Sequence, residues 1–202
     1  MKKHGVLSLF ILLLLCSCCS ANGKQQETAA GSSFQVELGY ERHEDVPGTY
    51  KIDFLFPRVS DSVANASAIN DRLKEDYMIE GDIPAVAEGY PYTWLEIHYL
   101  VSRQNGVCCL SILDTISSAY GSYSPNISVN NYFYNENTQQ VMNREEFFKA
   151  LGLSREDVTK AYAAACCPAY GPDDISFDGL TFYYTEQNEL RFVFSQTALA
   201  RP

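Results

Sequence analysis

Two pairs of adjacent cysteines, Cys108-Cys109 and Cys166-Cys167, are the residues of this sequence best suited to covalent or metal chemistry. An even number of cysteines in an oxidising compartment predicts disulfides. We expect the members of each pair to bridge to the other pair, with a connectivity that the sequence leaves open. Zinc is disfavoured, because adjacent cysteines lack the two-residue spacer that lets two thiolates reach one ion.

A cysteine nucleophile with His98 as its base is excluded by the geometry of a hairpin. Asn105-Gly106 predicts a tight turn between two strands, which places Cys108 opposite Arg103. His98 then lies about 16 Å from Cys108 and on the opposite face of the sheet. A base must be within hydrogen-bonding reach of its nucleophile, so this dyad is not expected to function.

His43 lies in a charged segment, residues 41–45, before Pro47-Gly48. It could bind a metal together with Glu44 or Asp45, but we predict an exposed loop histidine instead. The acids of Pro172-Asp173-Asp174 and Asp178 lack the spaced oxygen ligands of a calcium loop. We therefore expect no metal and no cofactor.

The sequence contains none of the common catalytic motifs. It has no Gly-rich phosphate loop, no His-Glu-x-x-His and no Gly-x-Ser-x-Gly. No pair of carboxylates stands out as suited to glycoside hydrolysis. We therefore predict that the protein is not an enzyme.

Four tyrosines on two loops rich in proline, glycine and serine are the candidate ligand-binding residues. Tyrosines on such loops can stack on sugars or anchor a protein interface. The alternative is that they cover the ends of the sheet. The four residues are Tyr90, Tyr92, Tyr120 and Tyr123.

Residues 1–17 have the features of a lipoprotein signal peptide. Lys2 and Lys3 precede an apolar run over residues 6–15, which is much shorter than the roughly 20 residues of a membrane-spanning helix. Leu15-Cys16-Ser17-Cys18 fits the pattern of a cysteine that becomes acylated.

We expect the acyl chains on Cys18, although Cys16 and Cys19 lie in the same window. An ordinary secretory signal is the alternative. The small polar residues of 18–33 predict a flexible tether. The sequence thus predicts a domain, residues 34–202, that is held to a membrane by lipid and faces the periplasm or the cell exterior.

The acidic balance restricts the partners of this domain. The formal charge of the chain is -10 at pH 7, and removal of a leader that contains two lysines and no acids changes it to -12. Nucleic acids and anionic lipid surfaces are polyanions and are disfavoured as partners. A cationic protein would be attracted.

Apolar periodicity predicts one α+β domain with a mainly antiparallel sheet and about three helices. The expected strands are residues 34–38, 50–56, 94–101, 107–117, 127–135, 179–185 and 190–195. The second strand is expected to end at Pro57. The expected helices run from a cap at Asp61 or Ser62 to about residue 78, over 144–151, and from 154 to about 167.

Several motifs, in their order along the chain, resemble a family of extracytoplasmic domains of unknown function. The family includes the lysozyme-sensing region of the anti-sigma factor RsiV and the domain preceding the catalytic part of the peptidoglycan deacetylase PdaC. The matching segments are an Ile-Asn helix at residues 68–73, and residues 121–126, 131–138, 142–148 and 178–184.

The resemblance implies a non-catalytic domain that binds a cationic muramidase-like protein or a cell-wall glycan. Two departures weaken any transfer of ligand contacts. Ser124 stands where the family usually has histidine, and a tyrosine-rich insert is reduced to residues 185–189. An assembly lipoprotein of an envelope complex, or less favourably a cell-wall hydrolase, is the alternative.

Overall fold

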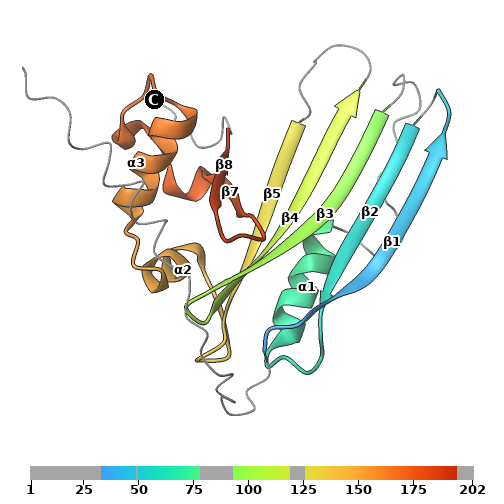
Figure 1. Ribbon diagram of the computed structural model, residues 1–202, viewed down its shortest axis with the longest axis horizontal. Helices are drawn as coiled ribbons and strands as arrows, with labels where there is room; N and C mark the ends of the chain where they lie inside the picture. The colour runs from blue at the N-terminus through green and yellow to red at the C-terminus, as the bar shows by residue number, and fades with distance from the viewer. Residues whose placement is uncertain (1–32, 49, 78–92, 119–125, 195–202) are drawn as a thin grey trace, which may run out of the picture. The chain divides into compact units, whose positions relative to one another are not determined.

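The computed structural model describes residues 33–48, 50–77, 93–118 and 126–194. The chain divides into two compact units, residues 1–30 and 31–202, and every described residue lies in the second unit. The described part contains a six-stranded sheet, a two-stranded sheet and three α-helices (Figure 1). The predicted α+β class with a mainly antiparallel sheet is confirmed. No helix within the described ranges is long and apolar enough to cross a membrane.

The strands of the main sheet follow one another in chain order. β2 and β3 run parallel, whereas every other neighbouring pair is antiparallel. A parallel pair needs a long crossover, and the helix α1 (Ala66–Tyr77) lies within it. The strands are β1 (Val36–Val46), β2 (Tyr50–Val59), β3 (Thr93–Gln104), β4 (Val107–Ser118), β5 (Asn126–Asn135) and β6 (Gln140–Met142).

The first two strands are longer than predicted. β1 continues to Val46, so His43 lies in a strand rather than in a loop. β2 continues through Pro57, which pairs with Leu38 beside a register shift in β1. Proline lacks an N–H group and is tolerated at bulges and strand edges, which explains why the strand does not end there.

The hairpin of β3 and β4 matches its prediction closely. Asn105 and Gly106 have φ angles of 51° and 76°, as a tight two-residue turn requires. Arg103 pairs with Cys108, and His98 pairs with Leu113. The register that excludes the cysteine–histidine dyad is therefore confirmed.

The helix α1 begins at Ala66, later than predicted, because Asn65 has a φ of 59° and cannot continue a right-handed helix. Ile69 and Leu73 of α1 are buried against the sheet, and we call the face of the sheet that α1 covers the inner face. Asn70 fixes the helix to β2, because its side chain accepts from the Val59 N–H and donates to the Val59 carbonyl, both at 2.9 Å.

The C-terminal part forms a second layer. α2 (Arg144–Ala150) and α3 (Arg155–Cys166) begin with reciprocal capping pairs, Asn143 with Glu146 and Ser154 with Asp157. Two short 3₁₀ turns lead to the hairpin of β7 (Thr181–Tyr184) and β8 (Leu190–Val193). This hairpin was expected, but it forms its own sheet and does not extend the main one.

Two hydrophobic cores lie on opposite faces of the main sheet. The inner core packs α1 against the sheet and includes Cys108. The second core packs the C-terminal layer against the opposite face, which we call the outer face, and includes Cys109, Phe133 and Cys167. Adjacent strand residues point to opposite faces, so Cys108 and Cys109 belong to different cores.

Phe34, just before β1, is fixed by backbone and ring contacts. Its N–H donates to the Glu136 carboxylate and its carbonyl accepts from Arg103, both at 2.8 Å. Arg103 and Glu136 also form an ion pair at 3.0 Å. The Phe34 ring stacks on Tyr134, with ring centroids 5.1 Å apart.

Candidate functional site

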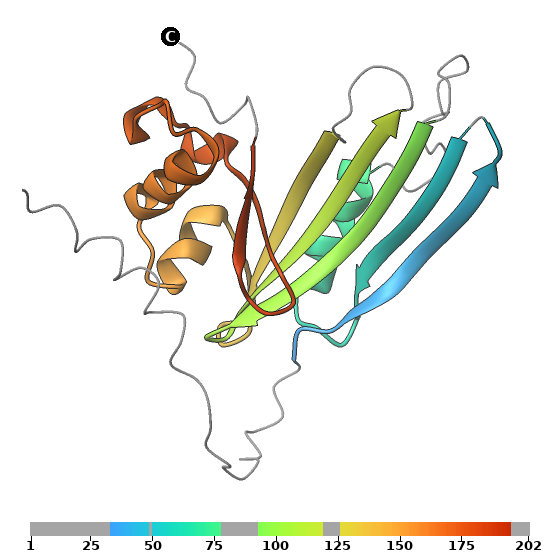
Figure 2. The same ribbon diagram turned by 45° about the horizontal axis from the view of Figure 1, so that its top comes forward.

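The candidate functional site is the outer face of β1, β2 and the adjoining half of β3. Figure 2 shows β7 and β8 beside β5, away from β1 and β2. Val107, Cys109 and Phe133 are buried under the C-terminal layer, but within the described part of the chain nothing comparable covers the outer face of β1 and β2. Trp94 on this face remains 39% exposed.

The strand registers determine which side chains share this face. Asp53 of β2 pairs with His43 of β1 on one side and with Glu96 of β3 on the other. His98 follows Glu96 by two positions and therefore points to the same face. Three adjacent strands thus bring two histidines and two carboxylates together.

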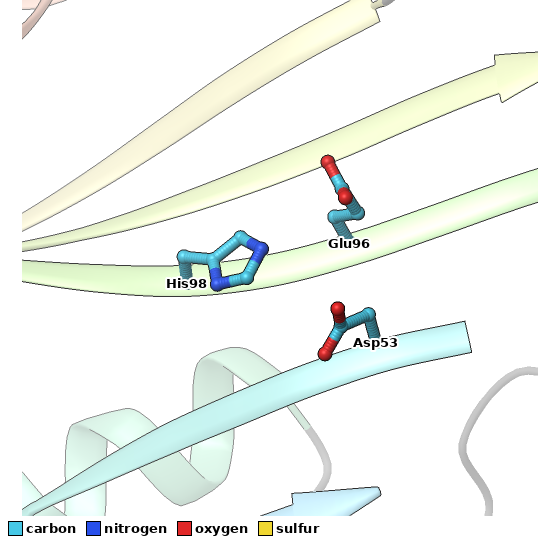
Figure 3. Close-up of side chains that lie close together, drawn as sticks. All are labelled: Asp53, Glu96 and His98. Carbon is cyan, nitrogen blue, oxygen red and sulfur yellow. The ribbon is translucent and has the colours of Figure 1, made fainter. Parts of the chain in front are cut away.

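Asp53, Glu96 and His98 form a close group (Figure 3). One ligand atom from each lies within 4.8 Å of the other two, and all three residues are half-buried. The Nδ1 atom of His43 lies 2.9 Å from an Asp53 carboxylate oxygen. His43 therefore contacts the acid from outside the group.

Trp94 and Lys51 lie next to this group, in register with each other across β2 and β3. The Lys51 ammonium lies 4.6 Å from the centroid of the Trp94 ring. A cation over a tryptophan face is attracted by the ring's negative charge density. That face of the ring is therefore already occupied.

The cysteines do not form the predicted bridges: Cys108, Cys109, Cys166 and Cys167 are free thiols. The two cores explain this for Cys108, which lies in the inner core while Cys167 lies in the outer one; Cys109 and Cys167 share the outer core, but their thiols are free as well. The sheet separates the thiols of Cys108 and Cys167. A bridge from each cysteine of one pair to the other pair is therefore wrong.

Burial also makes the thiols of Cys108, Cys109 and Cys166 poor nucleophiles and metal ligands. It raises the pKa of Cys108 to about 11 and that of Cys109 to about 12, and it raises the pKa of Cys166. The thiolate is the reactive form. Among the described residues, these three thiols are therefore poor candidates for surface chemistry.

The remaining sequence-predicted site residues fall outside the described ranges. These are Cys18, Tyr90, Tyr92, Tyr120 and Tyr123. His43 is described, but as a strand residue beside Asp53 and not as a loop ligand next to Glu44 or Asp45. Glu44 points to the inner face, where it binds Arg42 and Tyr50.

A shallow pocket of about 320 Å³ lies on the other side of the sheet, between α1 and the bulge of β1. Its lining includes Tyr40, Arg58, Asp61 and Lys74. Arg58 is paired with Asp61 at the pocket's rim. The pocket brings together no set of residues with evident chemistry.

Comparisons with known proteins do not assign a function. No protein-family model matches the chain, and no curated protein sequence matches it. A similar solved structure is that of a DUF3298 family protein from Pseudomonas aeruginosa. It is 10% identical, with a TM-score of 0.40, and the match covers 67% of this chain and 69% of that one. A likeness at this level says nothing about ligands or functional residues.

The group around Asp53 was missed because its members come from segments far apart in sequence. The sequence does contain a partial signal, since Glu96 and His98 alternate with apolar residues and so must share one face of a strand. What could not be predicted was the parallel neighbour. Only the pairing of β2 with β3 brings Asp53 to Glu96.

Proposed function

We propose that this protein is a non-catalytic lipoprotein of the cell envelope, whose domain binds a cationic protein through the outer face of β1 to β3. The observation that carries the proposal is the charge of that face. It presents the carboxylates of Glu41, Asp45, Asp53 and Glu96 against the single ammonium of Lys51. The whole chain has a formal charge of -10, so a cationic partner would be steered to the protein.

The resemblance to the extracytoplasmic RsiV/PdaC-like domains supports the same class of partner, a muramidase-like protein. A cell-wall glycan is the second candidate. An exposed tryptophan favours sugar stacking in general, but Lys51 occupies one face of Trp94. The charge and this contact together favour the protein.

Two other classes remain as alternatives. A cell-wall hydrolase would need a carboxylate pair in a cleft, whereas Asp53 and Glu96 are neighbours on one face of the sheet and neither lines the pocket beside α1 in the part of the chain that the structure describes. An assembly lipoprotein would copurify with an envelope complex and would bind no free ligand. The first experiment separates these possibilities.

The test is binding of residues 31–202, the unit that contains both cores, to hen lysozyme and to peptidoglycan fragments. We expect micromolar or tighter binding of lysozyme that weakens as salt rises, because screening shortens the range of charge attraction. Glycan binding that does not depend on salt would indicate a binding site other than the outer face of β1 to β3. Binding of neither probe would contradict the proposal and favour an assembly role.

Matched charge reversals test the location. Glu41→Lys with Asp45→Lys alters the outer face, whereas Asp71→Lys with Glu75→Lys alters exposed positions of α1 on the opposite side. Both double variants change the net charge equally. We expect the outer-face variant to weaken lysozyme binding at least tenfold more than the α1 variant. Equal weakening would show that net charge acts without this face.

A further inference from the structure

We propose that Asp53, Glu96 and His98 form a binding site for a divalent transition-metal ion such as zinc. The site lies on the outer face of the sheet (Figure 3). The site can bind a metal without the proposed function, but it shares Asp53 and Glu96 with it, and a bound dication would neutralise these two of the four carboxylates offered to a cationic protein.

The distances fit a metal after a small closure. Three atoms that lie within 4.8 Å of one another share a centre no more than about 2.8 Å from each, and zinc bonds to nitrogen or oxygen are about 2.0 to 2.2 Å long. Each ligand atom therefore has to move by less than 1 Å or so. Rotation of the half-buried side chains is enough, and the strands need not move.

The scaffold positions the ligands well. Asp53 and Glu96 are direct partners across β2 and β3, and His98 lies two residues further along β3. Sites built on strands are more rigid than sites built on loops. His43 on β1 adds a contact to Asp53 at 2.9 Å, and such outer partners orient a ligating carboxylate.

The charge of the group favours a bound cation. Like charges on neighbouring strands repel each other, and Asp53 and Glu96 are such a pair. A dication between them would replace this repulsion with attraction and make the group neutral. The nearby ammonium of Lys51 lies over the Trp94 ring, so it is not placed between the two carboxylates.

The donor set selects the ion. Calcium takes six to eight oxygen ligands, whereas this group offers one imidazole nitrogen and two carboxylates. Imidazole suits zinc, copper and nickel, and zinc lies above manganese and iron in affinity for such donors but below copper. Three protein ligands leave a fourth tetrahedral position, which water or a group from another molecule would fill.

The test is a calorimetric titration of the purified full chain, in detergent, with zinc. Treatment with N-ethylmaleimide first removes reachable thiols as competing ligands. We expect one zinc ion per chain with micromolar affinity. His98→Ala and Asp53→Asn should each weaken binding more than tenfold, while Asp45→Asn, an exposed acid on the same face, should change it less than twofold.

His43 is a positioning residue in this site, and its variants separate that role from a general effect. We expect His43→Ala to weaken zinc binding about tenfold, at the low end for outer-shell partners, because its side chain is 57% exposed. His43→Gln should restore most of the affinity, because the amide can donate to Asp53. Thermal melts without metal should show no loss of stability in the His43 variants, and Asp53→Asn should melt no lower than the unaltered chain, because it removes the repulsion between Asp53 and Glu96.

Zinc should also raise the melting temperature of the unaltered chain by a few degrees and leave that of His98→Ala unchanged. The proposal is overturned if the unaltered chain binds no zinc. It is also overturned if His98→Ala and Asp53→Asn bind zinc as tightly as Asp45→Asn does.

Discussion

Tyr134 has a buried hydroxyl with no hydrogen-bond partner among the described residues. A buried polar group without a partner costs about 1 to 3 kcal/mol. We expect Tyr134→Phe to leave the free energy of unfolding unchanged or to raise it by about 1 kcal/mol. Urea unfolding of the purified domain measures the change.

Tyr132 provides the matched control, two residues away on the same strand and face. Its hydroxyl donates to the Asp76 carboxylate at 2.6 Å, so Tyr132→Phe should lower the free energy of unfolding by about 1 to 2 kcal/mol. A loss of stability in Tyr132→Phe, together with no change or a gain in Tyr134→Phe, would support the hydrogen-bond assignment. A loss of the same size in both would contradict it.

The buried thiols and phenols make the fold sensitive to alkali. Burial raises the pKa of Cys108 to about 11, and those of Cys109 and Tyr77 to about 12. In the unfolded chain a cysteine ionises near pH 8.5 and a tyrosine near pH 10. The unfolded chain therefore releases these protons first, and stability present below pH 8 is lost as the pH rises.

We expect the free energy of unfolding, measured by urea under reducing conditions, to be level from pH 7 to 8 and to fall above pH 9. Each thiol should contribute a slope of up to about 1.4 kcal/mol per pH unit until its folded pKa is reached. Cys109→Ala should reduce the slope between pH 9 and 11, whatever it does to stability at pH 7. An unchanged slope would show that Cys109 is not the group responsible.

At the scale of elements, Asn70 joins α1 to the end of β2 through two hydrogen bonds to Val59. Asn70→Ala would leave a backbone donor and acceptor without these partners. We expect it to lower the free energy of unfolding by about 2 kcal/mol. Asn130→Ala, which removes an exposed hydrogen bond to Tyr77, should cost less than half as much in the same assay.

This contact also gives a physical meaning to the Ile-Asn pattern on which part of the family resemblance rests. Ile69 is buried in the inner core, and Asn70 binds the strand backbone. In this chain the pattern therefore marks how a helix docks on a sheet.

Elements with strong local signals could be predicted from sequence. The Asn105-Gly106 turn fixes the β3–β4 register, and the capping residues Asn143 and Ser154 locate the starts of α2 and α3. Elements that depend on distant partners could not. The short strand β6 and the passage of β2 through Pro57 exist only because neighbouring strands pair with them.

The candidate site illustrates the same limit. The alternation of Glu96 and His98 could be read from the sequence, but the position of Asp53 between them and His43 depends on two strand registers. Cys108 and Cys109 are both buried because each face of the sheet carries a core of its own. Local sequence patterns predict neither the strand registers nor the second core.

At the scale of the whole described unit, one sheet supports two cores that have no residue in common. β4 and β5 contribute to both, through alternate side chains such as Cys108 and Cys109. The C-terminal layer lies against one face, and α1 lies against the other. Within the described residues, neither α1 nor the C-terminal layer covers the outer face of β1 and β2, which is why we propose this face as the binding surface.

The anchoring of Phe34 determines how this protein would respond to a mechanical pull. A force applied through the preceding residues reaches Phe34 first, whose backbone is held by Glu136 and Arg103 and whose ring stacks on Tyr134. These residues lie on or next to β3 and β5, strands in the interior of the sheet. The force would therefore act first on the middle of the sheet. Only after these contacts break could β1 be pulled from the sheet edge residue by residue.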